Sequence, residues 1–301
     1  MSAVADKSAA TSHAPSFGTK APASTQKEVA GASAPVAFDY PNLRLLSRTL
    51  DDIERTRIML GNRIKAVLRS DPNAIEGLST PEYITQVETA LKATEAMTVE
   101  GIEGLWATHP LAPWAKTVRG VGPKTISRLI AEIGDPLLRP VGHWEGEDDA
   151  RTWVIDAYVP RTLSQLRAFA GHGDPARKRS KGMTQEEAFG MGNPLVKKRL
   201  WLIASGGVKA TCPAHRAAKK ARAEDDEDGW RPPPPGCTCA QTHVLRHVYD
   251  EARIKYATRV EETGIRAGQP WRPARQKAAA EREVGKAFLR LLHAEAERLA
   301  Q

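Results

Sequence analysis

The chain has few residues of the kinds that mark secreted or membrane proteins. Its 301 residues include three cysteines, and aromatic residues make up 6%. Three thiols cannot all pair with one another, so the sequence excludes a small scaffold held together by disulfides. No apolar run approaches the ~20 residues that span a bilayer, and Ala, Ser, Thr and Pro stand where a signal peptide would have its hydrophobic core. We therefore expect a cytoplasmic protein without membrane contacts.

The chain does carry an excess of positive charge. Lys and Arg number 44 against 36 Asp and Glu, which gives a formal net charge of +8. This balance suits a polyanionic partner, DNA or structured RNA, but does not by itself establish one.

Residues 1–40 form a low-complexity segment rich in Ala, Ser, Thr and Pro. They lack the periodic apolar positions that could offset the entropy lost on ordering, so we predict a disordered tail. An organelle transit peptide is the alternative interpretation. It is disfavoured because no arginine precedes Arg44.

Residues 41–108 show the spacing of a coiled coil, in two segments separated by the helix-ending Asp71-Pro72-Asn73. Two long helices joined in this way should fold back as an antiparallel hairpin, or pair with a second copy as a homodimer. Arg57 interrupts the first seam once. The remaining seam positions are Leu43, Leu46, Leu50, Ile53, Leu60, Ile64 and Val67 in the first segment, and Ile84, Val87, Leu91, Thr94, Thr98, Ile102 and Leu105 in the second.

Two glycines one residue apart lie between helix-like stretches in "TVRGVGPKTISRLIAEIGD", residues 117–135. Gly120, Val121 and Gly122 would form a tight hairpin, Pro123 would open the following helix, and Gly134 would close it. This is the pattern of a helix-hairpin-helix motif. Glycines allow close backbone approach, and the free amides of a helix N-terminus point at phosphate.

The cationic neighbours of the hairpin favour DNA-backbone binding over an ordinary helical turn. Lys124, Thr125 and Arg128 would add side-chain contacts to the sugar-phosphate backbone, and Val121 would pin the turn to the core. Such contacts bind without reading base sequence. A nucleotide-binding phosphate loop is excluded, because the long glycine-rich run and the preceding strand are both missing.

The segment "RGVGPKTISRLIAEIGDP" resembles the helix-hairpin-helix segment of the bridge-RNA-guided insertion-sequence transposases. "LSQLRAFAGHGDP" (163–175) and "GNPLVKKRLWLIA" (192–204) are similar to later segments of that family, in the same order, so the resemblance covers roughly residues 43–205. It implies a relationship to the coiled coil and C-terminal transposase domain. The family's N-terminal RNase H-like DEDD domain has no counterpart in this chain.

The resemblance also places Ser180 near the family's nucleophilic serine, with Lys181 where the family usually has glycine. A serine attacking DNA needs charge stabilisation and a base. Cations at Arg177, Lys178, Arg179 and Lys181 could stabilise charge, whereas a base is identifiable only as His172 or a residue of another subunit. The simpler interpretation is a basic loop that touches phosphate. Lys197-Lys198-Arg199 offers a second basic surface, or simply the exposed face of its helix.

The three cysteines and two histidines are concentrated between residues 212 and 243. Thiolates and imidazoles are tetrahedral zinc ligands, and a closed site would order an otherwise polar insertion, residues 211–243. The alternative is a flexible loop with reduced, non-ligating cysteines. The candidate structural zinc ligands are Cys212, His215, Cys237, Cys239 and His243.

The sequence thus predicts a mainly α protein with a disordered tail (1–40), a coiled-coil hairpin (41–108) and a helix-hairpin-helix domain (109–301). The favoured function is DNA binding, by a protein related to the C-terminal half of an insertion-sequence transposase. An active DNA strand-transferase using Ser180, and a coiled-coil assembly protein without nucleic-acid function, are the alternatives. An active transposase would require that Ser180→Ala lose a covalent DNA adduct while it retains binding.

Overall fold

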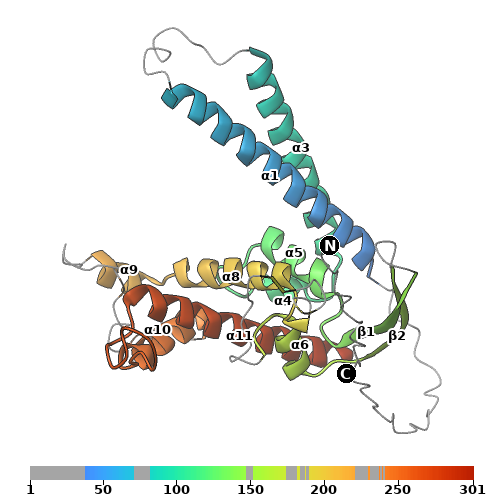
Figure 1. Ribbon diagram of the computed structural model, residues 1–301. Coiled ribbons are helices and arrows are strands. Elements are labelled where there is room, and N and C mark those ends of the chain that lie inside the picture. The colour runs from blue at the N-terminus through green and yellow to red at the C-terminus, as the bar shows by residue number, and fades with distance from the viewer. Residues whose placement is uncertain are drawn as a thin grey trace, which may run out of the picture. The chain divides into compact units, whose positions relative to one another are not determined.

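The described residues of this computed structural model are mainly helical, with one two-stranded antiparallel sheet (Figure 1). This confirms the prediction that the protein is mainly α-helical. Of the predicted tail, residues 1–37 lie outside the described part. Residues 38–40 correct the prediction, because Phe38 and Tyr40 pack against the core and a helix begins at Tyr40. The structure describes residues 38–70, 82–146, 152–173, 182–183, 187, 190–220, 230, 237, 239 and 241–301.

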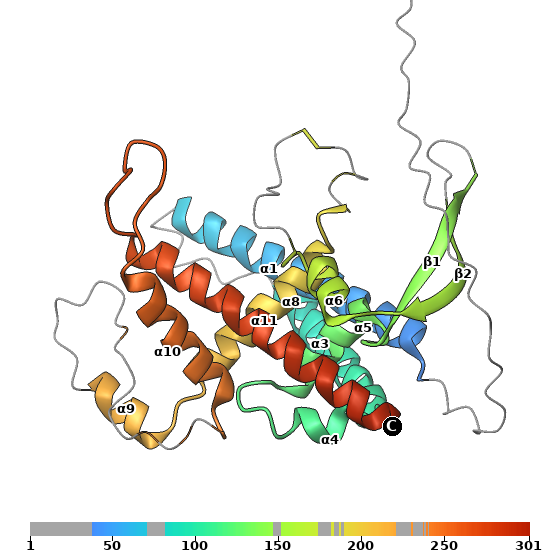
Figure 2. The ribbon, with the colours of Figure 1, turned by 90° about the horizontal axis from the view of Figure 1, so that it is seen from below.

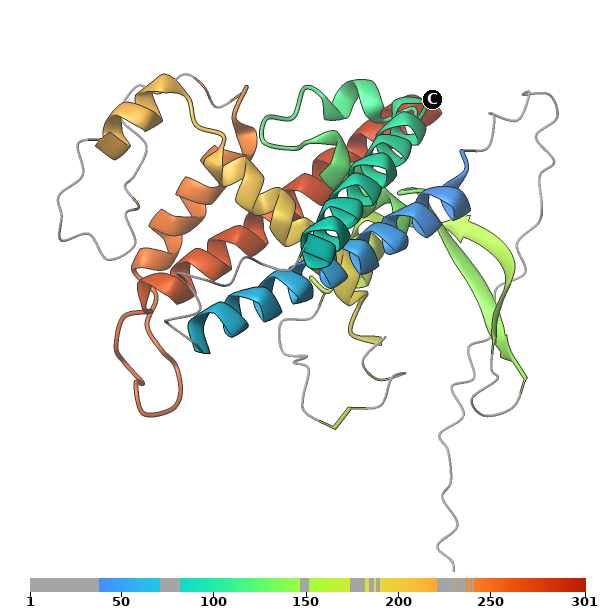
Figure 3. The same ribbon diagram turned by 90° about the horizontal axis from the view of Figure 1, so that it is seen from above.

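Helices α1 (Tyr40–Ser70) and α3 (Glu82–Ala107) lie side by side (Figures 1 and 3). The seam expected on α1 faces inward, and Leu43 and Leu50 are fully buried. On α3 the inward face differs from the expected one, since Val87 is 50% exposed and Thr94 is also exposed. Glu95 takes the inward place because it pairs with Arg57, the cation that interrupts the α1 seam.

Helix α5 (Pro123–Ile133) lies among α1, α3, α8 and the short α4 (Ala112–Ala115). It begins at Pro123 and ends at Gly134, whose φ of 71° is readily adopted by glycine, as the sequence predicts. Every residue from Ile126 to Ile133 is buried. The helix that follows the two glycines is therefore a central core element.

The remaining helices pack around α8 (Pro194–Lys209), which contacts α5, α10 (Val244–Ala257) and α11 (Pro273–Ala300) (Figure 2). The core here includes Phe288, Leu292 and Ile203. Two shorter helices flank α8 in the chain. Helix α6 (Leu163–Phe169) precedes it and begins with a Thr162–Gln165 capping box, and α9 (Pro213–Lys220) follows it. The sequence also predicts helices near residues 161–171, 194–205, 247–263 and 275–299. Helices α6, α8, α10 and α11 lie in these segments, although α10 begins earlier than predicted and ends at Ala257.

The sheet corrects one sequence interpretation. The acidic residues of the segment from Glu145 to Tyr158 predict a solvated loop, but β1 (Leu138–Glu145) pairs with β2 (Thr152–Pro160) in antiparallel register. The β2 sequence "TWVIDAYVP" is rich in aromatic and β-branched residues, which favour strands. The cluster of acids between the strands hid this signal.

Within the described residues, no helix combines the length and the apolar character needed to cross a membrane.

Candidate functional site

The two glycines of the α4–α5 turn have different structural roles. Gly120 has φ 85° and packs directly on α8, where a Cβ would lie 2.5 Å from the carbonyl oxygen of Gly206. A Cβ on Gly206 would in turn lie 2.3 Å from the carbonyl oxygen of Gly120. Gly122 has φ −87° and no atom within 4 Å of an added Cβ. Gly120 is therefore required for packing, whereas Gly122 borders open space.

Helix α5 begins directly after Gly122, which is its N-cap residue. The N–H groups of Thr125 and Ile126 donate to the Gly122 carbonyl oxygen at 3.0 and 3.1 Å. Pro123 has no N–H, so the Lys124 amide is the first-turn donor that these backbone bonds leave available. Val121 packs against the core, as predicted.

Arg128 and Lys124, both predicted DNA contacts, form ion pairs with acids of α1 and α3. Arg128 Nη2 lies 2.8 Å from Asp51 and 2.9 Å from Glu54, and its side chain is only 5% exposed. Lys124 Nζ lies 2.9 Å from Glu54, and its side chain is 34% exposed. Arg128 is thus held inside the protein, while Lys124 keeps access to solvent.

Two cations from α8 complete this network. Arg199 pairs with Asp51 from a buried position, and Lys198 Nζ lies 3.6 Å from the same carboxylate. The Lys198 side chain is 57% exposed. Tertiary packing therefore joins Lys198 and Arg199 of the "KKR" run to Lys124 and Arg128, which the sequence had placed on a separate surface.

The acids of the network stay charged at neutral pH. Burial would raise the pKa of Glu54, but hydrogen bonds from Arg128 and Lys124 outweigh it and lower that pKa to about 2. Burial likewise opposes ionisation of Asp51, and its bond with Arg199 and the charges of Arg128 and Lys198 lower its pKa below the usual value.

A pocket of about 460 Å³ opens over this network. Its lining contains five cationic side chains and one acid, Glu54. Two further acids, Asp51 and Glu95, form ion pairs with cations of the lining. The group as a whole therefore has five positive and three negative charges. The pocket therefore carries two uncompensated positive charges. Its lining residues are Glu54, Arg57, Ile58, Lys124, Thr125, Arg128, Lys198, Arg199 and Leu202.

The predicted basic loop and its serine, residues 177–181, lie outside the described residues. His172, considered as a base for Ser180, is described. Burial, followed by the charges of Lys286 and Lys197, lowers its pKa to about 4, so its imidazole is neutral at pH 7.

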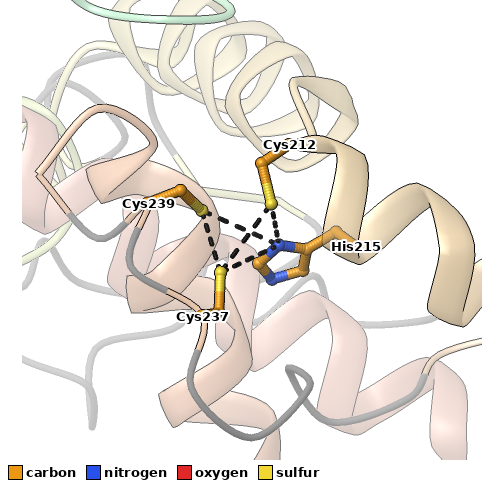
Figure 4. A group of neighbouring side chains, drawn as sticks. All are labelled: Cys212, His215, Cys237 and Cys239. Carbon is orange, nitrogen blue, oxygen red and sulfur yellow. Dashed lines mark hydrogen bonds between the residues drawn. The ribbon is translucent and has the colours of Figure 1, made fainter.

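The predicted metal ligands converge in a second site (Figure 4). Ligand atoms of Cys212, His215, Cys237 and Cys239 all lie within 4.8 Å of one another. The fifth predicted ligand, His243, is not in this group, and its Nδ1 instead lies 2.9 Å from the Thr242 hydroxyl.

His247, one helical turn further along α10, approaches the cluster instead of His243. Its Nε2 lies 3.1 Å from Cys239 Sγ. The sequence predicted His243 at this site and missed His247, because only the position of α10 decides which histidine reaches the cluster.

The thiols of the cluster differ in their tendency to ionise. Burial would raise the pKa of Cys212, but hydrogen bonding with His215 outweighs it and lowers that pKa to about 6. Burial and the neighbouring Cys237 raise the pKa of Cys239 to about 12. A bound divalent cation would remove this difference, because it favours all the thiolates at once.

A buried carboxylate lies behind the histidine of the cluster. Asp250, which is fully buried, accepts a hydrogen bond from His215 Nε2 at 3.1 Å. It also accepts from Trp230 Nε1 and Arg246 Nε, both at 2.9 Å. Donation from Nε2 directs the Nδ1 lone pair of His215 towards the sulfur atoms, the arrangement by which carboxylates orient metal-binding histidines. No motif or spacing in the sequence points to Asp250.

Comparison with known proteins shows no matching protein-family model, no matching curated protein and no matching solved structure.

Proposed function

We propose that this protein binds DNA through the phosphate backbone, at the pocket beside the α4–α5 turn. The observation that carries the proposal is the pocket's surplus of two positive charges next to the N-terminus of α5. Cations and helix N-terminal amides are the groups that hold phosphate oxygens.

The cationic residues of the pocket would have different roles in phosphate binding. Lys198 and Lys124 have accessible ammonium groups and would contact phosphate directly. Arg128 and Arg199 are fixed by carboxylates, so they contribute positive potential rather than free hydrogen-bond donors. None of these groups reads a base edge, and binding should therefore depend on charge and shape more than on sequence.

The proposal extends to the architecture that the sequence suggests. In it, α4, the glycine turn and α5 form a helix-hairpin-helix motif, and α1 and α3 form a coiled-coil hairpin, as in the C-terminal half of the insertion-sequence transposases that the chain resembles. The Gly120 packing on α8 and the Arg57–Glu95 pair between α1 and α3 support this arrangement. DNA transposition would be the setting of such a protein.

We further propose that the Cys/His cluster holds a structural zinc ion. Three thiolates and one imidazole form a closed tetrahedral set of the kind found in structural zinc sites. Such a site leaves no position open for a reacting water, so its contribution is to folding.

The test is a salt-series binding titration on linear duplex DNA, branched DNA and structured RNA. We expect affinity to fall steeply with salt, and Lys198→Ala to weaken binding and reduce the log–log salt slope by about 1. Gly122→Val should fit the fold, because no atom lies near the added Cβ. It should still abolish binding, because a branched side chain would stand in front of the α5 amides.

Two matched substitutions serve as controls. Gly104 also has no atom within 4 Å of an added Cβ, and Lys277 is an exposed lysine on α11. Gly104→Val and Lys277→Ala should leave affinity unchanged. Wild-type affinity in both Gly122→Val and Lys198→Ala would refute the proposed site, and binding to structured RNA alone would identify RNA as the partner.

A further inference from the structure

The Cys/His cluster is connected to the glycine turn by a continuous series of contacts. We infer that Cys212, His215, Cys237 and Cys239 bind a soft divalent cation, and that its binding fixes the α8 backbone on which the glycine turn rests. The inference deepens the proposed function, on which only its DNA measurement depends.

The ligand geometry supports a tetrahedral site. In tetrahedral coordination with metal–ligand bonds of about 2.0–2.3 Å, ligand atoms are separated by roughly 3.3–3.8 Å. The separations among these four ligand atoms include 3.1 Å from Cys212 Sγ to His215 Nδ1, 3.7 Å from Cys212 Sγ to Cys237 Sγ, and 3.8 Å from Cys239 Sγ to His215 Nδ1. Such thiolate-rich sets select zinc and similar soft ions.

The first connection from the cluster runs through Asp250. This carboxylate orients His215 and also accepts the Nε–H of Arg246, while Arg246 Nη1 donates to the carbonyl oxygen of Val208 at 3.0 Å. Val208 belongs to the last turns of α8. Asp250 is therefore a positioning residue that links a metal ligand to α8 through Arg246.

The second connection runs through the first turn of α10. The His243 N–H donates to the carbonyl oxygen of the ligand residue Cys239 at 2.8 Å. Leu245, two residues later, packs against Gly207 so closely that a Cβ there would lie 2.7 Å from the leucine side chain.

Both connections end where the glycine turn rests on α8. Gly206, next to Gly207, makes the close backbone contact with Gly120. A cation that joins Cys212 and His215 to Cys237 and Cys239 would hold these contacts in register. Without it, the two pairs of ligands lose the bonds that join them, and the α8 end and the turn lose that support.

Backbone hydrogen exchange tests the linkage directly. Full-length protein is compared with stoichiometric Zn²⁺ and after chelation, and exchange is followed in peptides covering residues 117–126 and, as an internal control, the β1–β2 strands. We expect one zinc per chain. We also expect faster exchange in the turn after chelation, recovery when Zn²⁺ is restored, and no change in the strands.

Cobalt substitution tests the role of Asp250. Co²⁺ bound by three thiolates gives an absorption signature whose titration reports affinity. Asp250→Asn should weaken Co²⁺ binding by 10- to 100-fold, as changes behind a metal-binding histidine do. The matched control is Asp156→Asn, since Asp156 contacts an exposed histidine, His143, on the strands. That variant should bind Co²⁺ like the wild type.

Arg246→Ala separates metal binding from linkage, because Arg246 is not a ligand. It should keep one zinc per chain and wild-type helicity, while the turn exchanges faster even with zinc bound. Absence of stoichiometric metal, or a turn whose exchange ignores both chelation and Arg246→Ala, would overturn the inference. The turn could respond to zinc while the protein binds no DNA, with or without zinc. That result would refute the proposed function and would still support the link between the metal and the turn.

Discussion

At the scale of single residues, Arg128 shows how tertiary contacts change the role of a cation. Its position in the motif predicts a contact with phosphate. In the structure its guanidinium is buried between Asp51 and Glu54, which lie more than 70 residues earlier in the chain. Its charge still adds to the potential of the pocket, but its hydrogen bonds serve the fold.

Removing Arg128 should therefore destabilise the protein. Arg128→Ala leaves the partly buried Glu54 without its main partner and removes one of the cations beside Asp51, and we expect the free energy of unfolding to fall by about 3–5 kcal/mol. Lys124→Ala removes a more exposed partner and should cost only about 0.2–1 kcal/mol. Urea denaturation at pH 7 measures both.

The pH dependence provides a check on the same pairs. The folded pKa of Glu54 is lowered to about 2 from its usual value of 4.5. The stabilisation from Glu54 is therefore complete above pH 4.5 and is lost as the pH falls towards 2. Equal stability of Arg128→Ala and wild type at pH 7 would show that Lys124 satisfies Glu54, and that Arg199 and Lys198 satisfy Asp51, without Arg128.

At the scale of elements, the close approach of the glycine turn to α8 depends on a pair of glycines far apart in sequence. A helical glycine normally costs about 0.5–1 kcal/mol relative to alanine. At Gly206 that cost is outweighed, because a Cβ would overlap the Gly120 carbonyl group.

We expect opposite effects from two glycine-to-alanine changes. Gly206→Ala should destabilise the protein by about 1–3 kcal/mol, because backbone must move to admit the methyl group. Gly104→Ala, on an exposed part of α3 with open space, should stabilise it by about 0.5–1 kcal/mol. Thermal unfolding of the two variants measures the difference. A neutral Gly206→Ala would mean that the turn can move away from α8 without cost.

At the scale of the whole molecule, α3 presents a second set of apolar positions to solvent. Tyr83, Val87, Ala90, Thr94 and Met97 are all exposed and follow alternating spacings of four and three, the pattern of a helix seam. Met97 is 73% exposed. Because α1 covers a different face of α3, this seam stays exposed among the described residues and would suit pairing with a second copy of the chain.

We predict that the protein is a homodimer in solution. Light scattering should give twice the chain mass of 32.8 kDa, and Val87→Glu combined with Met97→Glu should give the monomer. Met59→Glu, at another exposed methionine on α1, is the control and should stay dimeric. Because each copy carries a net charge of +8, added salt should favour the dimer while it weakens DNA binding. A monomeric wild type across micromolar concentrations would exclude this pairing.

The sequence by itself determined the mainly helical character, the boundaries of α5 and the four members of the Cys/His cluster. These follow from local chemistry: apolar periodicity along a helix, proline at its start, glycine at its end, and cysteines near one another in the chain. It missed the β1–β2 sheet because acids between the strands masked their β-forming residues.

Only the tertiary structure decided which groups meet. It joined Asp51 and Glu54 to Arg128, replaced His243 with His247 beside the cluster, and placed Asp250 behind His215. It also showed that Gly120 serves a contact with α8, while Gly122 borders open space. The physical reason is that ion pairs, hydrogen bonds and close backbone contacts depend on how distant elements pack, and local periodicity carries no information about that packing.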